Sequence, residues 1–294
     1  MLTWKTSTSA SCSHAARVIG DGLEIVDTQL AAELLPQAEG LLRATVEYGD
    51  NAEALLRALG SLSAQFENNR ELARAALVRV FGQSETTDAR VSTLAAAVAS
   101  LESTMMRQRP KLAEELVART RPLREQWEAR GPGLLKAMHR LAGAQLTPDS
   151  AEVVLVAPLA GGHGYAYPIT NRVVFEGLLT DARPDLAETL RLGWLLAQLN
   201  ADLPAVAEAV GPLRAARASA LATVPVALAA SEDLGLAAGG VEMLPAALEA
   251  WHCVPGDPAP TAEALHNWWN TYRDSVTGWP VAVAALDQML AEQS

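Results

Sequence analysis

The chain has few cysteines and no long apolar run. Cys12 and Cys253 are its only cysteines, lie far apart and have no CxxC spacing, so neither a cysteine-based zinc site nor a redox motif is indicated. Two free thiols are expected, as in a reducing compartment, with a disulfide between them as the alternative. The most apolar stretch, residues 192–199, is far shorter than the roughly 18 residues of a membrane-spanning helix. Residues 1–22 contain no apolar stretch of signal-peptide length, so we expect a cytoplasmic protein that does not bind membranes.

Positive charge is also scarce. The chain has 23 Lys and Arg against 34 Asp and Glu, which gives a formal net charge of −11 and a pI of about 5.0. This acidic balance provides no overall field for a phosphate backbone, and the basic residues of 119–130 alternate with Glu125 and Glu128. Nucleic-acid binding is therefore not expected. Hydrophobic residues at 50% and charged residues at 19% are typical of a globular protein with a full-sized core.

The first part of the sequence predicts a short hairpin followed by a helical bundle. Residues typical of β-strands lie at 2–6, 17–19 and 23–26, and the Asp-Gly pair at 21–22 between the last two is a hairpin turn signal. Helical periodicity with short links then predicts antiparallel helices over residues 38–48, 52–59, 68–81 and 88–107. We assign residues 1–120 to this N-terminal hairpin and helical bundle region.

Residues 121–294 are expected to form a helical domain with two central strands. A Gly-Pro-Gly sequence at 131–133 is expected to break a helix. Runs of β-branched residues at 152–157 and 172–176 predict two strands, separated by a Gly-rich loop over 158–170. The other predicted helices cover residues 134–141, 181–204, 213–230, 241–251, 262–272 and 279–290. The predicted fold class is therefore mainly α (α+β), with a small β-sheet or hairpin before a buried central helix.

The central helix is predicted over residues 181–204, DARPDLAETLRLGWLLAQLNADLP, the most strongly helical and most apolar segment. Pro184 suits a first helical turn, and apolar residues on most sides are typical of a core helix. Arg191 is the one charged residue in its middle. We expect its side chain to reach solvent or a carboxylate, with Glu176 as the first candidate.

The order of elements over residues 133–204 resembles that of zincin-type metallopeptidases. In zincins, a helix, a strand, a Gly-rich loop and a second strand precede a buried helix with the motif H-E-x-x-H, whose two His bind zinc while the Glu polarises water. If Gly193 is set against the Gly that is often fourth, Leu190 and Trp194 stand in the places of the two His, and Arg191 in that of the Glu. The resemblance thus implies a degenerate zincin domain without a metal site; an α+β core with a merely apolar helix is the alternative. The block RLGWLLAQLN also resembles a family of bacterial proteins, which implies no function.

No complete catalytic or metal-binding motif is present, so no catalytic residue, metal or cofactor is predicted. His163 has no second His at a metal-site spacing, and the glycines around it form neither a dinucleotide fingerprint nor a P-loop. Glu152 and Glu176 could face each other as a carboxylate pair or occupy solvent-facing positions of a half-buried sheet. The best candidates for a pocket are His163, Tyr165, Glu176, Arg191 and Trp194.

Three functions of different classes fit this sequence. The first, which we favour because no complete motif accompanies a full-sized core, is a non-catalytic scaffold or interaction module with an unidentified protein partner, such as a pseudo-metallopeptidase. The second is an enzyme with an unfamiliar site around residues 158–176. The third is a small-molecule sensor, because Trp251, Trp268, Trp269 and Trp279 could form an aromatic groove, unless they clamp the terminal helices onto the core.

Overall fold

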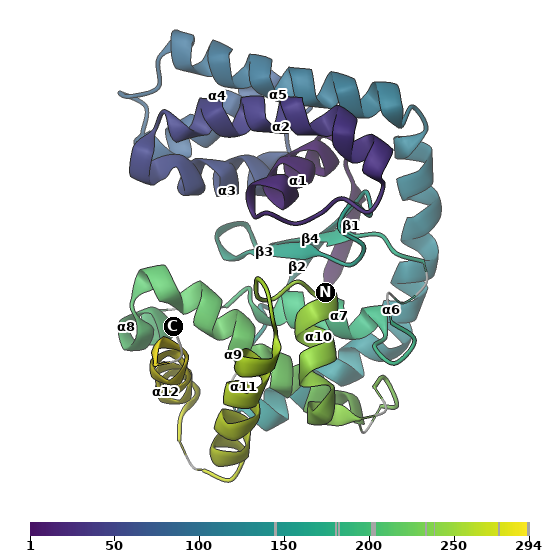
Figure 1. The fold of residues 1–294 in the computed structure, drawn as a ribbon, viewed down its shortest axis with the longest axis vertical. Helices are drawn as coiled ribbons and strands as arrows, with labels where there is room; N and C mark the ends of the chain where they lie inside the picture. Colours follow the sequence, from purple (N-terminus) through teal and green to yellow (C-terminus); the bar gives the residue numbers. More distant parts are fainter. Residues whose placement is uncertain are drawn as a thin grey trace.

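The computed structural model describes residues 1–143, 146–179, 181, 183–200, 204–232, 234–237, 239–275 and 277–292. Within these ranges the chain forms twelve α-helices and one small mixed sheet, which confirms the predicted mainly α (α+β) class. Figure 1 shows the sheet between a layer of N-terminal helices and a layer of C-terminal helices. Short 3-10 helices span Gly49–Asn51, Pro168–Thr170 and Gly240–Met243.

The sheet unites strands from both ends of the sequence. Its strands are β1 (Leu2–Thr6), β2 (Ala151–Val156), β3 (Gly164–Tyr167) and β4 (Arg172–Glu176). They lie in the order β1-β2-β4-β3, with β1, β2 and β4 parallel and β3 antiparallel to β4. β2 and β4 are central and largely buried, as their β-branched runs predict. β3 lies within the segment predicted as a loop, and it forms an edge of the sheet that has no second neighbour in the described part of the chain.

The predicted N-terminal hairpin is wrong, because the residues after β1 form the helix α1 (Thr8–Gly20). The side chain of Ser7 caps this helix by accepting a hydrogen bond from the Ala10 N–H at 3.0 Å. The Asp-Gly pair ends the helix instead of turning a strand, and Gly22 takes a φ of 74° that favours glycine. β1 finds its partner in the distant strand β2, a pairing that local sequence signals cannot reveal.

The N-terminal layer contains α2 (Thr28–Val46), α3 (Ala52–Leu62), α4 (Asn69–Phe81) and α5 (Asp88–Gln108). α2 begins earlier than predicted because Asp27 caps it, with its carboxylate accepting from the Leu30 N–H at 3.0 Å. The helix also continues through Pro36. Helices α1, α2, α4 and α5 enclose apolar side chains that belong to the main hydrophobic core, which extends into the C-terminal layer.

A single long helix, α6 (Leu112–Ala142), connects the two layers along one side of the molecule (Figure 1). It includes position 120, where the predicted division fell, and it continues through Pro122 and Pro132. The predicted break at 131–133 is therefore wrong. Gly131 lies against the Trp127 ring, where a Cβ would come within 2.3 Å of ring atoms, so this glycine serves packing within a continuous helix.

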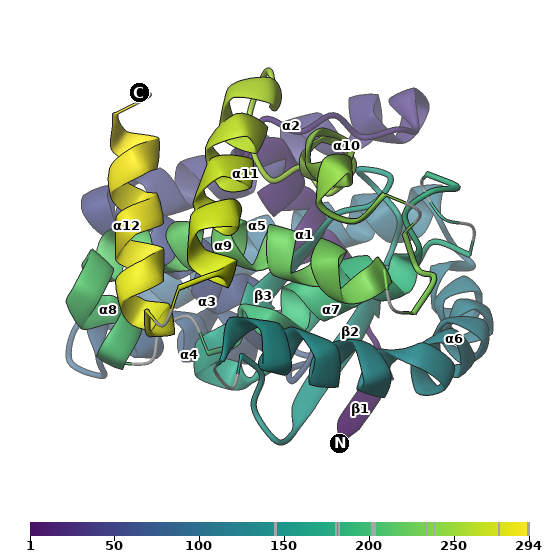
Figure 2. The same ribbon diagram turned by 90° about the horizontal axis from the view of Figure 1, so that it is seen from below.

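The C-terminal layer holds α7 (Glu188–Ala197), α8 (Pro204–Val210), α9 (Pro212–Glu232), α10 (Leu244–Ala250), α11 (Ala259–Arg273) and α12 (Trp279–Ala291), as Figure 2 shows from below. The central helix, α7, is buried as predicted but much shorter than residues 181–204. Its first residue, Glu188, donates its N–H to the Asp181 carboxylate at 2.8 Å, so the preceding acidic segment caps the helix from a loop. Positions 182 and 201–203 of the predicted helix lie outside the described residues.

The C-terminal tryptophans fill the core between helices. Trp251, Trp268, Trp269 and Trp279 are all buried. Trp268 stacks on Tyr272 with ring centroids 5.3 Å apart and donates its indole N–H to the Ala282 carbonyl of α12 at 2.7 Å. These contacts are those of the clamp that the sequence offered as the alternative to a ligand groove.

No single helix among the described residues is both long and apolar enough to cross a membrane. The pair formed by Pro204–Val210 and Arg214–Glu232 passes the same criteria of length and composition only when taken together, and it is bent by 104°.

Candidate functional site

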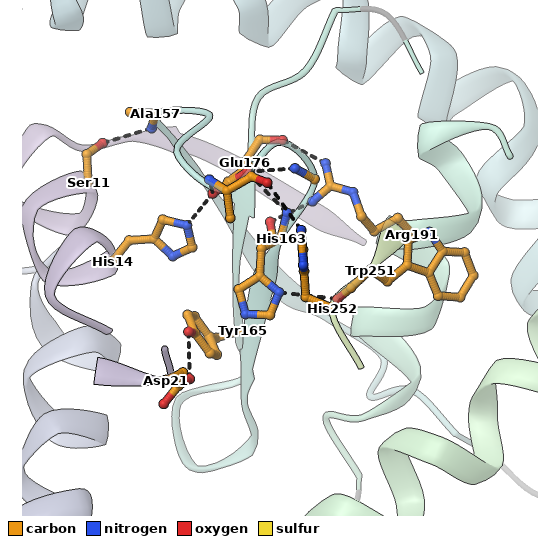
Figure 3. Close-up of polar contacts among 12 residues, drawn as sticks. Ser11, His14, Asp21, Ala157, His163, Tyr165, Glu176, Arg191, Trp251 and His252 are labelled. Atoms are coloured by element: carbon orange, nitrogen blue, oxygen red, sulfur yellow. Dashed lines mark hydrogen bonds and ion pairs between the residues drawn. The ribbon is translucent and has the colours of Figure 1, made fainter. Parts of the chain in front are cut away.

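A buried carboxylate organises the loop that leads into β3. Glu176, the last residue of β4, is fully buried and accepts hydrogen bonds from four groups. The backbone N–H groups of Ala160 and Gly162 donate at 2.8 Å each, that of His163 at 3.1 Å, and His14 Nε2 of α1 lies 2.8 Å from Oε1 (Figure 3). Gly162 takes a φ of 138°, which favours glycine and lets the chain wrap around the carboxylate. Glu176 therefore fixes the Gly-rich loop against both the sheet and α1.

These hydrogen bonds keep Glu176 ionised. Burial by itself would raise the pKa of this carboxyl group, but the hydrogen bonds from His14, Ala160 and Gly162 outweigh burial and lower the pKa from 4.5 to about 2. The imidazole of His14 must carry its hydrogen on Nε2, because the carboxylate can only accept. A charged carboxylate thus lies where β4, the Gly-rich loop and α1 meet, and groups of this chain donate all four of its hydrogen bonds.

Arg191 joins α7 to the same junction. Its guanidinium is buried and donates to the His163 carbonyl at 2.6 Å and to the Glu176 carbonyl at 2.8 Å. The carboxylate that it reaches is Glu188, three residues earlier on α7, and the guanidinium also lies 4.0 Å from the centroid of the Phe175 ring. The predicted pairing of Arg191 with the Glu176 carboxylate is wrong. The carboxylate of Glu176 turns into the Gly-rich loop, and Arg191 contacts only the backbone carbonyl of Glu176 (Figure 3).

His163 presents a free nitrogen at this junction. Its Nδ1 lies 3.2 Å from the Trp251 carbonyl, which can only accept, so Nδ1 carries the hydrogen and Nε2 offers a lone pair. Nε2 is buried and has no hydrogen-bond partner among the described residues. Burial, together with the nearby His14, lowers the pKa of His163 to about 3, so the ring is neutral near pH 7. An unsatisfied buried acceptor costs about 1 to 3 kcal/mol, which a ligand donor would recover.

His163 lines a cleft of about 820 Å³ along the edge strand β3. One wall comes from the N-terminal layer, including Arg17 of α1 and Ala58 of α3, and the other comes from Ala220 of α9 and the segment 252–255. The surface of the cleft is mostly apolar. Its place between the two helical layers is one of the common positions of ligand sites.

The backbone of β3 has unused hydrogen-bonding groups beside this cleft. The His163 carbonyl accepts from the Glu176 N–H at 3.1 Å, and paired residues alternate along an antiparallel strand. It follows that Tyr165 and Tyr167 exchange hydrogen bonds with β4, whereas Gly164 and Ala166 direct their N–H and C=O groups to the other side. Both of these residues line the cleft, and their outward groups have no partner in the described ranges.

Tyr165 is held as a neutral phenol at the cleft wall. Its hydroxyl donates to Asp21 at 2.8 Å, and the Arg17 guanidinium lies 4.7 Å from its ring centroid. Burial and the adjacent Asp21 carboxylate raise the pKa of Tyr165. Its ring also meets the edge of His163, with centroids 4.5 Å apart, which fixes the orientation of that imidazole (Figure 3).

The five residues predicted for a pocket divide into two groups. His163, Tyr165 and Trp194 line the cleft, while Glu176 and Arg191 lie buried behind it and hold the loop and helix in place. Trp194 donates its indole N–H to the Ala220 carbonyl at 2.8 Å. Its ring stacks on Trp251, with centroids 5.3 Å apart.

Three groups at the cleft could not be assigned from the sequence: the His14 imidazole, the Trp251 carbonyl and the His252 imidazole. His14 lies on the helix that was predicted as part of a hairpin, and Trp251 contributes a backbone carbonyl, a group that no side-chain pattern identifies. His252 follows Trp251 with a φ of 53° and places its Nε2 3.2 Å from the Ala160 carbonyl. Trp251 itself stood out in the sequence only as one of the four C-terminal tryptophans.

Two other groups from the sequence have structural partners. Glu152 and Glu176 lie at opposite ends of the paired strands β2 and β4, so they do not form a carboxylate pair. Glu152 instead accepts from Arg172 at 2.6 Å and from Lys5 at 2.6 Å. Cys12 and Cys253 are free thiols. No group of three or more His, Cys, Asp or Glu within the described ranges could hold a metal ion.

No protein-family model, no curated protein and no solved structure matches this chain.

Proposed function

We propose that this chain is a non-catalytic protein-interaction module that binds an extended polypeptide segment along β3. The observation that carries the proposal is the edge of β3, whose Gly164 and Ala166 direct unused backbone groups into the cleft. An extended segment could add to this edge as a fifth strand, with backbone hydrogen bonds supplying affinity and the cleft walls selecting side chains. We also infer a location in the cytoplasm, which the free thiols support.

The strand β3 sets the length of such a segment. A peptide paired with the four residues of β3 would extend about 13 Å, at about 3.3 Å per residue. Its side chains would alternate between the walls formed by the N-terminal and C-terminal helices. The Glu176 carboxylate holds the Gly-rich loop, and Arg191 holds the carbonyl groups of His163 and Glu176. β3 is therefore preorganised, which reduces the entropy lost when a peptide binds.

We infer binding without catalysis from the protonation states at the cleft. Burial lowers the pKa of His163 to about 3, which makes its Nε2 a weak base but still a hydrogen-bond acceptor. Burial raises the pKa of the Cys253 thiol, which keeps it protonated and poorly nucleophilic. In α7, Leu190 is a buried core side chain, and the Trp194 indole donates to the Ala220 carbonyl. The two positions that carry zinc-binding His in a zincin therefore hold packed core side chains in this chain. A degenerate zincin ancestry stays part of the proposal, and it rests on the order of elements over residues 133–204.

The test is selection of displayed random dodecapeptides on the full chain, followed by comparison of two variants. Ala166→Pro removes the outward N–H of β3, a change that an edge position tolerates, and should abolish capture of the enriched peptides. Ala166→Gly keeps that N–H and should retain capture. Amide hydrogen exchange of Gly164 and Ala166 should slow when a selected peptide binds. Failure to enrich any peptide, or equal capture by both variants, would refute the proposal, provided that both unfold at temperatures close to that of the parent chain.

A second candidate function is general-base catalysis, which the free Nε2 of His163 favours. A substrate O–H bound beside this nitrogen could be deprotonated as it reacts. The measurement is hydrolysis of a panel of nitrophenyl esters, phosphates and glycosides by the parent chain and by His163→Ala. Activity above background that disappears in the variant would establish this alternative, and equal rates for both proteins would exclude it for those substrates.

A further inference from the structure

We infer that the polypeptide segment bound along β3 carries acidic side chains, an inference that rests on the function proposed above. Four arginines line the cleft: Arg17, Arg57, Arg79 and Arg217. Asp21 is the only acidic residue among the described residues of the lining. The cleft is thus locally basic in a chain whose formal net charge is −11.

Two of these arginines are already neutralised by carboxylates. Arg17 donates to Glu53 at 2.7 Å and lies 3.5 Å from an oxygen of Asp21. Arg57 shares the same Glu53 oxygen at 2.7 Å. These groups form an internal network at the N-terminal wall, and they leave less positive charge for a ligand than their number suggests.

Arg79 and Arg217 differ in this respect. Both are exposed, and neither has a carboxylate partner within the described ranges. Arg79 belongs to α4 in the N-terminal layer and Arg217 to α9 in the C-terminal layer, so free guanidinium groups reach the cleft from both walls. Guanidinium groups bind carboxylates with two parallel hydrogen bonds, and apolar walls strengthen the field between charges.

His163 supplies an independent sign of a ligand in the cleft. His163 is only 6% exposed, yet its Nε2 has no partner and the ring lines the cleft. A neutral acceptor of this kind fits an N–H or O–H donor, such as a peptide N–H or a Ser, Thr or Asn side chain. A strand that pairs with β3 therefore lies in a cleft lined both by the His163 ring and by positive charges.

A nucleic acid is the other polyanion that arginines attract. Two observations favour a polypeptide: the unused N–H and C=O groups of β3 match a peptide backbone, and the acidic remainder of the chain repels a long phosphate backbone. The mostly apolar surface of the cleft also suits a few acidic side chains among apolar ones.

The experiment uses fluorescein-labelled decapeptide pools with blocked ends, random except for one central position fixed as Glu, Gln or Lys. Fluorescence anisotropy with the full chain should give a Kd about tenfold lower for the Glu pool than for the Lys pool, with the Gln pool between them. The preference should weaken when the salt concentration rises from about 50 mM to about 500 mM.

The double variant Arg79→Glu with Arg217→Glu should reverse this preference. Its matched control is Arg121→Glu with Arg124→Glu, which changes the net charge equally at exposed positions of α6 outside this cleft. The control should keep the preference for the Glu pool. Equal reversal in both variants would mean that net charge alone decides binding and would overturn the inference.

The outcomes separate the two proposals. Suppose that the pools bind the parent chain, that Ala166→Pro abolishes this binding, and that the Glu pool binds no more tightly than the Lys pool. This result would overturn only the inference about charge. Failure of every pool to bind the parent chain would overturn the proposed function as well. Tighter binding of a single-stranded oligothymidine than of any peptide pool would overturn both in favour of a nucleic acid.

Discussion

Replacing Glu176 by Gln should destabilise the protein by about 3 kcal/mol at neutral pH. The side-chain amide keeps the shape of the carboxylate but turns one acceptor oxygen into a donor. That group would then face two of the four donors that surround Glu176, for example Gly162 and His163 or Ala160 and His14. Hydrogen bonds to a charged group contribute about 1.5 to 3 kcal/mol each, so the loss of two gives about 3 kcal/mol or more.

The pKa of Glu176 gives a second route to the same magnitude. The difference between the usual value of 4.5 and about 2 corresponds to about 3 kcal/mol. Because the pKa is lower in the folded chain than in the unfolded chain, this stabilisation is complete above about pH 4.5 and is lost as the pH falls through about 2. At about pH 3 roughly 1.5 kcal/mol should remain. The difference in stability between the parent chain and the variant should therefore shrink by about half between pH 7 and pH 3.

The assay is urea unfolding followed by tryptophan fluorescence at both pH values. The matched control is Glu53→Gln, since Glu53 also accepts from two arginines but its side chain is 51% exposed. This exposed change should alter the free energy of unfolding by less than about 1 kcal/mol. A loss below about 1 kcal/mol for Glu176→Gln, or the same loss at both pH values, would refute the reasoning about the buried carboxylate.

Four further substitutions, in two matched sets, test the packing around the site. Arg191→Met should lower the free energy of unfolding by about 3 to 5 kcal/mol, because it leaves Glu188 buried without its partner. Adding Glu188→Gln should restore part of that loss, which chemical denaturation measures. An equal loss in the single and double variants would show that the ion pair is not the cause. Gly60→Ala should lower the thermal midpoint, because its Cβ would lie 2.2 Å from the Tyr167 hydroxyl, whereas Gly40→Ala has open space in a helix and should raise stability by about 0.5 to 1 kcal/mol. Equal shifts of the midpoint in both alanine variants would contradict this account of the α3–β3 contact.

Local sequence patterns predicted correctly those elements whose structure depends mainly on the residues within them. The β-branched runs became β2 and β4, and the apolar central segment became the buried helix α7. The ends of these elements were less predictable. α7 begins only at Glu188 because Asp181 caps it from a loop, and α6 passes residues 131–133 because Gly131 accommodates the Trp127 ring. In both cases a side chain several residues away in the sequence, Asp181 or Trp127, helps to decide where the helix starts or whether it continues.

The candidate site depends on contacts that are distant in sequence. His163 was recognisable as a candidate, but its protonation, its tautomer and its free Nε2 follow from burial, from His14 and from the Trp251 carbonyl. Likewise, Arg191 was expected to need a carboxylate, and the structure supplies Glu188 because positions three apart lie on the same side of a helix.

The sequence by itself determined the mainly helical class and the buried central helix, because these depend on propensity and periodicity within single segments. It also determined that Leu190, Arg191 and Trp194 bring no metal-binding groups to that helix. Only the tertiary structure decided that β1 pairs with β2, that β3 lies at an edge of the sheet among the described residues, and that the cleft beside it is basic. These features arise from the packing of the two helical layers against the sheet, and such long-range packing leaves no local pattern in the chain.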